Sequence, residues 1–275
     1  MMCMARQARV RWSALFLLGF PVLSGCADPP GKHTGPAERA RTLNVRIGVE
    51  MLRNPYWYEE NGHKEEAKQF WDKDHWNRVL RGWADEGYDH LIYWVEPWNK
   101  HAWQTFLVRH TEHPEAADLT AERSDKLQKH VAWIFGRAHE LGLKNLLFSY
   151  FIVTTPAFAK AHGMDRELPV SASVDFRHNL KHMGYHFGVR NEKTRKFTEA
   201  AIAELFKSFK DLDGLYGAMG EAVPGKRSAW YREAVVPGLK RSGRKPLFIA
   251  SSWMQPLDDF LEDMAPKEVY GNTWL

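Results

Sequence analysis

From residue 43 onward, short apolar runs alternate with longer stretches that have a helical period. Six runs of strand length cover residues 43–50, 89–95, 144–153, 213–219, 246–252 and 268–274. Amphipathic stretches cover residues 72–86, 120–141, 191–210, 227–241 and 256–264. This alternation predicts an α/β fold with a parallel sheet and right-handed crossovers. Because no glycine-rich phosphate loop follows the first run, a nucleotide-binding doubly wound sheet is disfavoured.

The ends of these runs favour a TIM (β/α)8 barrel over other parallel sheets. Polar or aromatic residues stand at or just beyond them: Glu50, Glu96, Tyr150, Glu221, Trp253 and Trp274. The C-terminal ends of barrel strands converge on one mouth, where active sites lie. A closed barrel needs eight strands, whereas this chain supplies about six strand–helix units and ends at Leu275. We therefore expect an incomplete barrel over residues 43–275, with a long insertion at 154–189, and hypothesise a C-terminally truncated fragment.

The N-terminus has the pattern of a targeting segment. Three arginines (Arg6, Arg9 and Arg11) precede an apolar run over residues 12–23, which is too short to span a membrane. The sequence Leu23-Ser24-Gly25-Cys26 follows and is typical of a bacterial lipoprotein signal. We expect residues 1–25 to be the signal peptide, Cys26 to carry a lipid anchor to the cell envelope (periplasm or outer membrane), and residues 26–42 to be a flexible tether. An ordinary signal peptide cleaved near Ala27 is the alternative.

Composition narrows the classes of partner. The formal charge of +4 is small for 275 residues, and basic and acidic residues are interspersed, so no nucleic-acid surface is indicated. The only cysteines are Cys3 and Cys26, so a chain without its signal peptide has no disulfide and no cysteine-based metal site. The pattern does not indicate an oligomeric state.

Aromatic residues are abundant: 12 Trp, 15 Phe and 9 Tyr. Aromatic rings stack well on the apolar C–H faces of sugars, although they also fill barrel interiors and helix–sheet interfaces. We expect a carbohydrate partner, with the residues nearest the strand ends lining its site: Trp94, Trp98, Tyr150, Trp253 and Trp274.

Glu221 is the leading candidate for chemistry. It follows a short run rich in small and apolar residues and precedes a Pro-Gly turn, so it is expected at the mouth of the barrel. Loss of hydration beside the apolar wall would raise the pKa of this carboxyl group and suit a general acid. Alternatively, Glu221 caps the next helix or pairs with Lys226 or Arg227.

The barrel layout and these residues resemble the (β/α)8 glycoside hydrolases, in which an acid/base Glu commonly ends the fourth strand. Met219-Gly-Glu-Ala-Val-Pro-Gly225 is also similar to a Glu-x-x-Pro-Gly motif of α-glucuronidases, whose Glu is the catalytic acid. The resemblance implies hydrolysis of glycosidic bonds in an extracellular or periplasmic carbohydrate, with Glu221 as general acid and no cofactor.

The chain departs from this pattern in its second acid. Glycosidases generally use two carboxylates, and the fifth and sixth runs end without one. Asp258 and Asp259 more simply begin a helix. Glu50 and Glu96 are the alternatives, each of which can instead form a structural ion pair; we also expect both among the substrate contacts.

Two other functions remain open. A non-catalytic glycan-binding lipoprotein on a TIM-barrel scaffold would account for the aromatics and for the missing acid. A metal-dependent hydrolase would use histidines at four-residue intervals: His178, His182 and His186. No acid lies among them and Gly184 weakens a helix, so no metal is expected, and His178 is assigned to sugar hydroxyls. Arg190 either belongs to the cap formed by Asn191 and Glu192 or reaches a uronate carboxylate.

Overall fold

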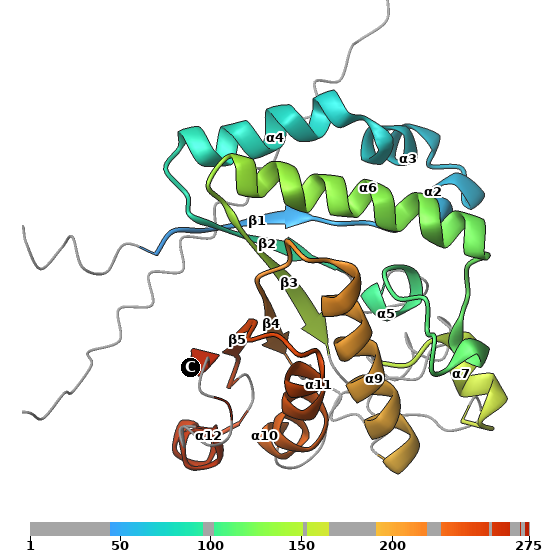
Figure 1. Ribbon diagram of the computed structural model, residues 1–275, viewed down its shortest axis with the longest axis vertical. Helices are drawn as coiled ribbons and strands as arrows, with labels where there is room; N and C mark the ends of the chain where they lie inside the picture. Colours follow the sequence, from blue (N-terminus) through green and yellow to red (C-terminus); the bar gives the residue numbers. More distant parts are fainter. Residues whose placement is uncertain are drawn as a thin grey trace, which may run out of the picture. The chain divides into compact units, whose positions relative to one another are not determined.

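The computed structural model describes residues 45–95, 102–150, 153–164, 191–218, 227–252, 255–264, 270 and 273–274 (Figure 1). The chain divides into two compact units, Met1–Asn44 and Val45–Leu275, and the described residues all belong to the second. The expected signal peptide, the tether and Cys26 therefore lie outside the described residues. No helix in the described part of the chain is both long and apolar enough to cross a membrane.

Six strands form one parallel sheet in the order of the sequence. They are β1 (Ile47–Met51), β2 (His90–Trp94), β3 (Lys144–Tyr150), β4 (Gly214–Ala218), β5 (Leu247–Ala250) and β6 (Thr273–Trp274). Each overlaps one of the six runs expected from the sequence, and every neighbouring pair is parallel. Among the described strands, β1 and β6 are each paired on one side only. The parallel sheet is confirmed, while the strands that the structure describes do not close into a barrel.

The expected helices are present, and several short ones add to them. Those expected are α4 (Lys73–Asp85), α6 (Ala121–Glu140), α9 (Glu192–Ser208), the continuous run α10 (Arg227–Trp230), η4 (Tyr231–Val235, a π-helix) and α11 (Val236–Arg241), and α12 (Leu257–Met264). Four short helices were not expected: α2 (Pro55–Glu60), α3 (Lys64–Trp71), α5 (Trp103–Phe106) and η3 (Pro114–Ala116). A fifth, α7 (Pro156–Ala161), begins at the cap residue Thr155.

Side-chain caps fix where the long helices begin. Thr120 accepts a hydrogen bond from the Arg123 N–H at the start of α6, and Asn191 accepts one from the Thr194 N–H at the start of α9. Such caps satisfy N–H groups that have no partner within the helix. The capping role expected for Asn191 is therefore confirmed, whereas Arg190 lies outside the described residues.

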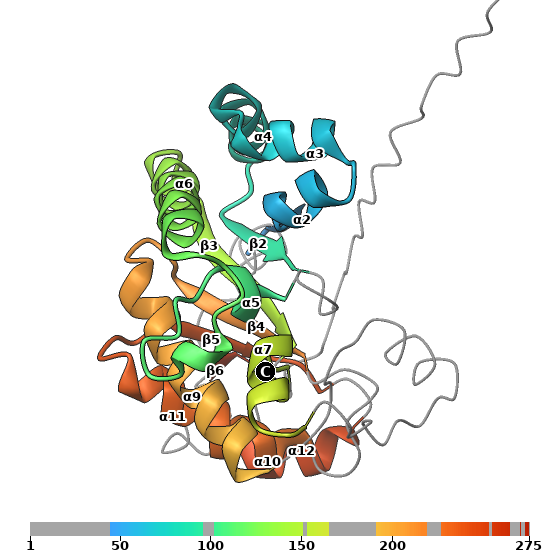
Figure 2. The ribbon, with the colours of Figure 1, turned by 90° about the vertical axis from the view of Figure 1, so that its right-hand side faces the viewer.

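The described helices cover one face of the sheet. Leu91, Tyr93, Leu147, Leu215 and Phe248 point to that side and share one large core with apolar residues of α4, α6, α9, α11 and α12. The opposite face, here called the inner face, carries a smaller cluster of strand residues: Ile92, Leu146, Phe148 and Leu247, with Trp94, Tyr216 and Ile249 against it. Figures 1 and 2 show the long helices following the outer side of the sheet. Sequential strand order with helices on one side is the arrangement of a barrel, whereas doubly wound sheets carry helices on both faces.

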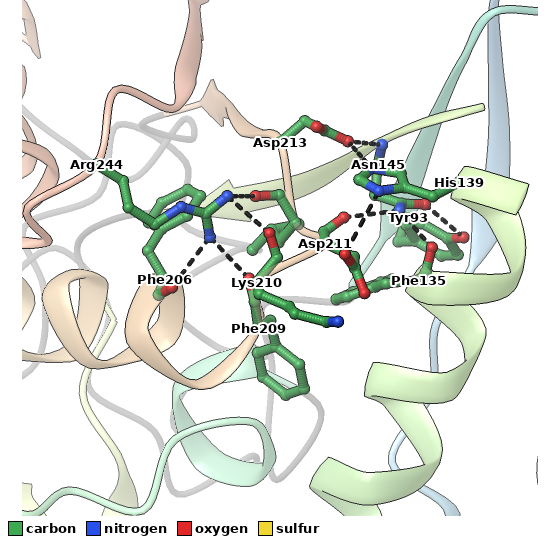
Figure 3. A network of polar contacts seen from close by, with 11 residues as sticks. Tyr93, Phe135, His139, Asn145, Phe206, Phe209, Lys210, Asp211, Asp213 and Arg244 are labelled. Carbon is green, nitrogen blue, oxygen red and sulfur yellow. Dashed lines mark hydrogen bonds and ion pairs between the residues drawn. The ribbon is translucent and has the colours of Figure 1, made fainter. Parts of the chain in front are cut away.

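A buried polar network joins the N-terminal ends of β3 and β4 (Figure 3). The Tyr93 hydroxyl donates to Asn145 Oδ1 at 3.0 Å, and Asn145 Nδ2 donates to the carbonyls of Phe135 (2.9 Å) and Asp211 (2.8 Å). Asp213 Oδ2 accepts from the Asn145 N–H and lies 2.7 Å from His139 Nε2. Burial, with a smaller contribution from Glu50 and Asp213, raises the pKa of Tyr93 well above its ordinary value. At this end of a barrel, such contacts stabilise the fold.

Arg244 closes the end of α9 in the same region (Figure 3). Its guanidinium donates to the carbonyl oxygens of Phe206, Phe209, Lys210 and Leu212 at distances of 3.0, 2.9, 2.8 and 3.0 Å. These carbonyls lie at and after the C-terminus of α9, where helical partners run out. Arg244 therefore fixes the connection from α9 into β4.

Candidate functional site

Strand register places one row of side chains across the inner face, close to the C-terminal ends of the strands. Met51 pairs with Trp94, Phe148 with Tyr216, and Tyr216 with Ile249. The pairing of Tyr93 with Leu147 brings Trp94 and Phe148 to the same level. We call Met51, Trp94, Phe148, Tyr216 and Ile249 the inner row. Trp274 of β6 pairs with Ile249.

Three aromatic rings of the inner row stack in succession. The ring centroids of Trp94 and Phe148 lie 3.9 Å apart with planes 15° from parallel, and those of Phe148 and Tyr216 lie 5.5 Å apart at 21°. Phe148 is only 3% exposed, whereas Trp94 and Tyr216 are half-buried. The stack therefore presents accessible aromatic surface at both of its ends.

The inner face is exposed at β1, the strand next to Trp94. Ile47 and Val49 have the same strand parity as Met51, and their exposed fractions are 36% and 48%. Such exposure is unusual for aliphatic residues in a parallel strand, which normally lie between two covered faces. Apolar walls with a few polar groups are the usual lining of small-molecule sites.

Buried contacts hold the segments on either side of residues 219–226. The Tyr231 hydroxyl of η4 lies 3.0 Å from the Gly217 carbonyl and 3.1 Å from the Ser251 carbonyl, which links β4 to the end of β5. Beyond that segment, Ser228 Oγ lies 2.5 Å from Asp263 Oδ2 and accepts from Gln255 Nε2 at 2.7 Å. The β4 and β5 ends of the inner face are thus built on fixed elements.

The structure places Glu50 on the opposite side of the sheet from the inner row. Glu50 pairs with Tyr93, whose side chain is in the helix-facing core, and its Oε2 accepts from Trp83 Nε1 of α4 at 3.4 Å. Successive strand residues point to opposite faces, so Glu50 and Met51 cannot share a face. Strand parity therefore directs the Glu50 carboxylate toward the helices and away from the inner row.

Trp94 is the expected site residue whose side chain the structure describes and places on the inner face. Tyr150 and Trp274 lie in β3 and β6, but their side chains are outside the described set. The remaining candidates also lie outside the described residues: Glu96, Trp98, His178, Arg190, Glu221 and Trp253. The sequence analysis missed Phe148 and Tyr216, which two-residue alternation within β3 and β4 would have indicated once the register was known.

Metal ligation finds no support in the described part of the chain. No group of three or more His, Cys, Asp or Glu side chains there is arranged to hold a metal ion. The candidate histidines at 178, 182 and 186 lie outside the described residues.

Comparison with known proteins identifies the fold. No family model matches the chain, and no curated protein matches it. Among solved structures, the chain is similar to a GH138 enzyme targeting pectin rhamnogalacturonan II, with a TM-score of 0.64 and 17% identity over 84% of this chain and 26% of that one.

Lower similarities involve other glycoside hydrolases. The pneumococcal protein StrH, studied for N-glycan recognition and hydrolysis, gives a TM-score of 0.49 at 10% identity, over 86% of this chain and 59% of that one. An α-amylase from Lactobacillus plantarum gives 0.45 at 16% identity, over 75% and 45% of the two chains. The chain therefore shares its fold with part of the GH138 enzyme, and it spans about a quarter of that enzyme's length.

Proposed function

We propose that this protein binds carbohydrate on the inner row and hydrolyses its glycosidic bonds. The observation that carries the proposal is the stack of Trp94, Phe148 and Tyr216, which is accessible at both ends and lies near the C-termini of the strands, the end at which barrel enzymes hold their substrates. The apolar face of a sugar ring matches such a surface. The likeness of the fold to a glycoside hydrolase supports the proposal, although a fold alone does not fix an activity.

In this mechanism Glu221 is the general acid. Its position in the sequence supports the role, because it comes three residues after Ala218, the last residue of β4. The protonated carboxyl group would donate its proton to the glycosidic oxygen as the bond to the anomeric carbon breaks. A second carboxylate would activate water or attack the anomeric carbon, and Glu96 is the remaining candidate of the two weighed from the sequence.

The alternative is a glycan-binding protein without catalysis. One observation favours it: the inner row contains no acidic residue among the positions that the structure describes, and Glu50 faces the helices. Binding by the aromatic stack does not require a carboxylate, so the inner row serves either function.

One assay separates the two functions. The full chain is incubated with rhamnogalacturonan, xylan and starch, and both reducing-end release and polysaccharide binding are measured. Hydrolysis predicts release by the wild type and a loss of at least about 100-fold in Glu221→Gln, with binding kept. Glu233→Gln, at an exposed position in η4, is the matched control and should keep full activity. Binding without release supports the alternative, and the absence of both contradicts the two proposals.

We further propose that Cys26 anchors the exported protein to the cell envelope. The order of arginines, apolar run and Leu-Ser-Gly-Cys supports this placement. Cys26→Ser should move the protein from the membrane fraction to the soluble fraction and abolish labelling by a fatty-acid probe. Unchanged fractionation and labelling would contradict the anchor.

A further inference from the structure

A pocket of about 290 Å³ lies beside the first turn of α6, away from the inner row. We call it the α6 pocket. Its lining comes from α6 and from the loop between α5 and α6: Val108, Arg109, Ala117, Leu119, Ala121, Ser124 and Asp125. Because α6 runs into β3, its first turn is at the end of the molecule where the strands have their C-termini, with α5 and α7 at the same end (Figure 1).

An ion pair supplies adjacent donors and acceptors in this pocket. Arg109 Nη2 lies 2.6 Å from Asp125 Oδ1, and the two side chains are 48% and 47% exposed. The guanidinium has further N–H groups, and the carboxylate has further lone pairs. The pair has no net charge, so it neither selects an anion nor selects a cation. Neighbouring hydroxyl groups of a sugar match it, since each hydroxyl both donates and accepts.

Ser124 is a second and independent indication of a ligand. Ser124 is one of the residues that line the pocket and is 6% exposed, and its Oγ is enclosed without a hydrogen-bond partner among the residues that the structure describes. A buried hydroxyl without a partner destabilises the fold, because its hydration is lost without replacement. Because this Oγ is enclosed, a hydroxyl in the pocket would bond to it after rotation of the side chain to another staggered position.

The remaining lining is apolar, and the loop is held in place from outside. Val108, Ala117, Leu119 and Ala121 supply the apolar wall. Glu204 of α9 accepts from the N–H groups of Arg109 and Thr111, both at 2.8 Å, and Glu112 pairs with Arg241 of α11. A site held in its bound shape avoids part of the ordering cost of binding.

We propose that the α6 pocket binds one neutral sugar ring as a non-catalytic glycan subsite. Its volume is near the lower end of the roughly 300–1,000 Å³ found for small-molecule sites, which limits the occupant to about one ring. The apolar wall receives the C–H face of the ring, the Arg109–Asp125 pair receives neighbouring hydroxyls, and Ser124 receives a third. The site does not depend on hydrolysis at the inner row.

The test is a titration of the isotope-labelled full chain followed by ¹H–¹⁵N NMR. The probes are the methyl glycosides of glucose, galactose and rhamnose, with sodium sulfate as the anionic probe. At least one glycoside should shift the Ser124 and Asp125 amides saturably in the millimolar range, while sulfate should not. Asp125→Asn and Ser124→Ala should each weaken that binding several-fold, and Leu119→Trp, which fills the pocket, should abolish it.

Matched variants keep the test specific. Asp85→Asn at the end of α4 and Ser208→Ala at the end of α9 should leave glycoside affinity unchanged. If Leu119→Trp does not fold, the two polar variants still decide the outcome. Binding of sulfate in place of glycosides, shifts that survive all three pocket variants, or no glycoside shift would each overturn the proposal. Release assays and the Trp94 indole signal report on the inner row alone. A failure of the function proposed for the inner row can therefore be told apart from a failure of the α6 pocket.

Discussion

The indole of Trp94 in β2 lies parallel to the ring of Phe148 in β3, with their centroids 3.9 Å apart. Phe148 is covered by this contact and by Tyr216, whereas Trp94 is left half-buried at the end of the stack. The buried ring therefore holds the exposed one in a fixed orientation. A rigid aromatic surface is ready to bind a sugar without ordering a side chain first.

Trp94→Ala should weaken carbohydrate binding about tenfold, because roughly 1.4 kcal/mol of stacking would be lost. Trp133→Ala is the matched control: this half-buried tryptophan belongs to α6, where Lys73 Nζ lies 4.7 Å from its ring centroid. Isothermal titration calorimetry with a polysaccharide that the wild type binds gives both affinities. Weakening by Trp133→Ala but not by Trp94→Ala would place the ligand on the helix layer instead.

Gly214→Ala should destabilise the sheet. A Cβ at this position would overlap the Leu247 carbonyl oxygen, which belongs to the neighbouring strand and cannot move without disturbing the β4–β5 pairing. We expect a loss of about 2–3 kcal/mol in the free energy of unfolding. Gly82→Ala provides the contrast, since its Cβ would meet nothing within 4 Å on exposed α4 and should stabilise by about 0.5–1 kcal/mol. Chemical denaturation measures the free energy of unfolding of both variants. Equal changes in the two variants would contradict the close approach of Gly214 to the Leu247 carbonyl.

The buried network at the base of β3 makes Asn145 and Tyr93 interdependent. Asn145→Ala should cost about 3 kcal/mol, because it leaves the Tyr93 hydroxyl and two carbonyls without the partner they share. Tyr93→Phe should cost about 1 kcal/mol. In the double variant no Tyr93 hydroxyl is left without a partner. The double variant should therefore lose about 1 kcal/mol less free energy of unfolding than the sum of the two single variants. Strict additivity in denaturant unfolding would contradict the shared hydrogen bond.

The stability of the fold should fall as the pH drops from about 7 to 5, in part through His130. Burial lowers the pKa of His130, and the nearby Lys73 and Lys126 lower it further. The hydrogen bond between Nε2 and the Phe70 carbonyl, at 2.7 Å, opposes this shift only in part. Because the folded pKa is below the unfolded one, the unfolded chain binds the proton more readily below pH 6.5. The contribution is therefore fully present above that pH and is lost as the pH falls toward the folded pKa.

Melting temperatures at several pH values measure this dependence. His130→Gln should flatten it without removing it, because burial also lowers the pKa of His110. His63→Gln, at a half-exposed side chain, is the comparison variant for the effect of a His-to-Gln change. A slope that is the same in His130→Gln and in the wild type would show that His130 does not titrate with unfolding.

Strand–helix alternation predicted all six strands and the long helices, because buried strands and long amphipathic helices carry many apolar residues in a regular period. The short helices α2 and α3 were missed. Each has few turns, and α2, with the sequence PYWYEE, shows no amphipathic period. Boundaries set by one side chain, such as Asn191 at α9, were recoverable because the capping residue types are specific.

The face of the sheet to which each side chain points was harder to predict from the sequence. Because Glu50 ends a strand, its side chain was expected at the mouth of the barrel. In the structure Glu50 pairs with Tyr93, and its side chain therefore lies on the side of the helices. Phe148 and Tyr216 were not singled out from the sequence, because their alignment with Trp94 depends on the register between strands. Register is a tertiary property, fixed by the packing of one face against the helices.

The most direct test of the inner row is the indole region of the ¹H–¹⁵N spectrum, recorded while the full chain is titrated with an oligosaccharide that it binds. Comparison with the Trp94→Phe spectrum assigns the Trp94 signal among the 12 tryptophans. The account predicts that the Trp94 indole signal shifts saturably while the signal of Trp133 on α6 does not. A saturating shift at Trp133 with an unmoved Trp94 signal would contradict the claim that carbohydrate binds on the inner face.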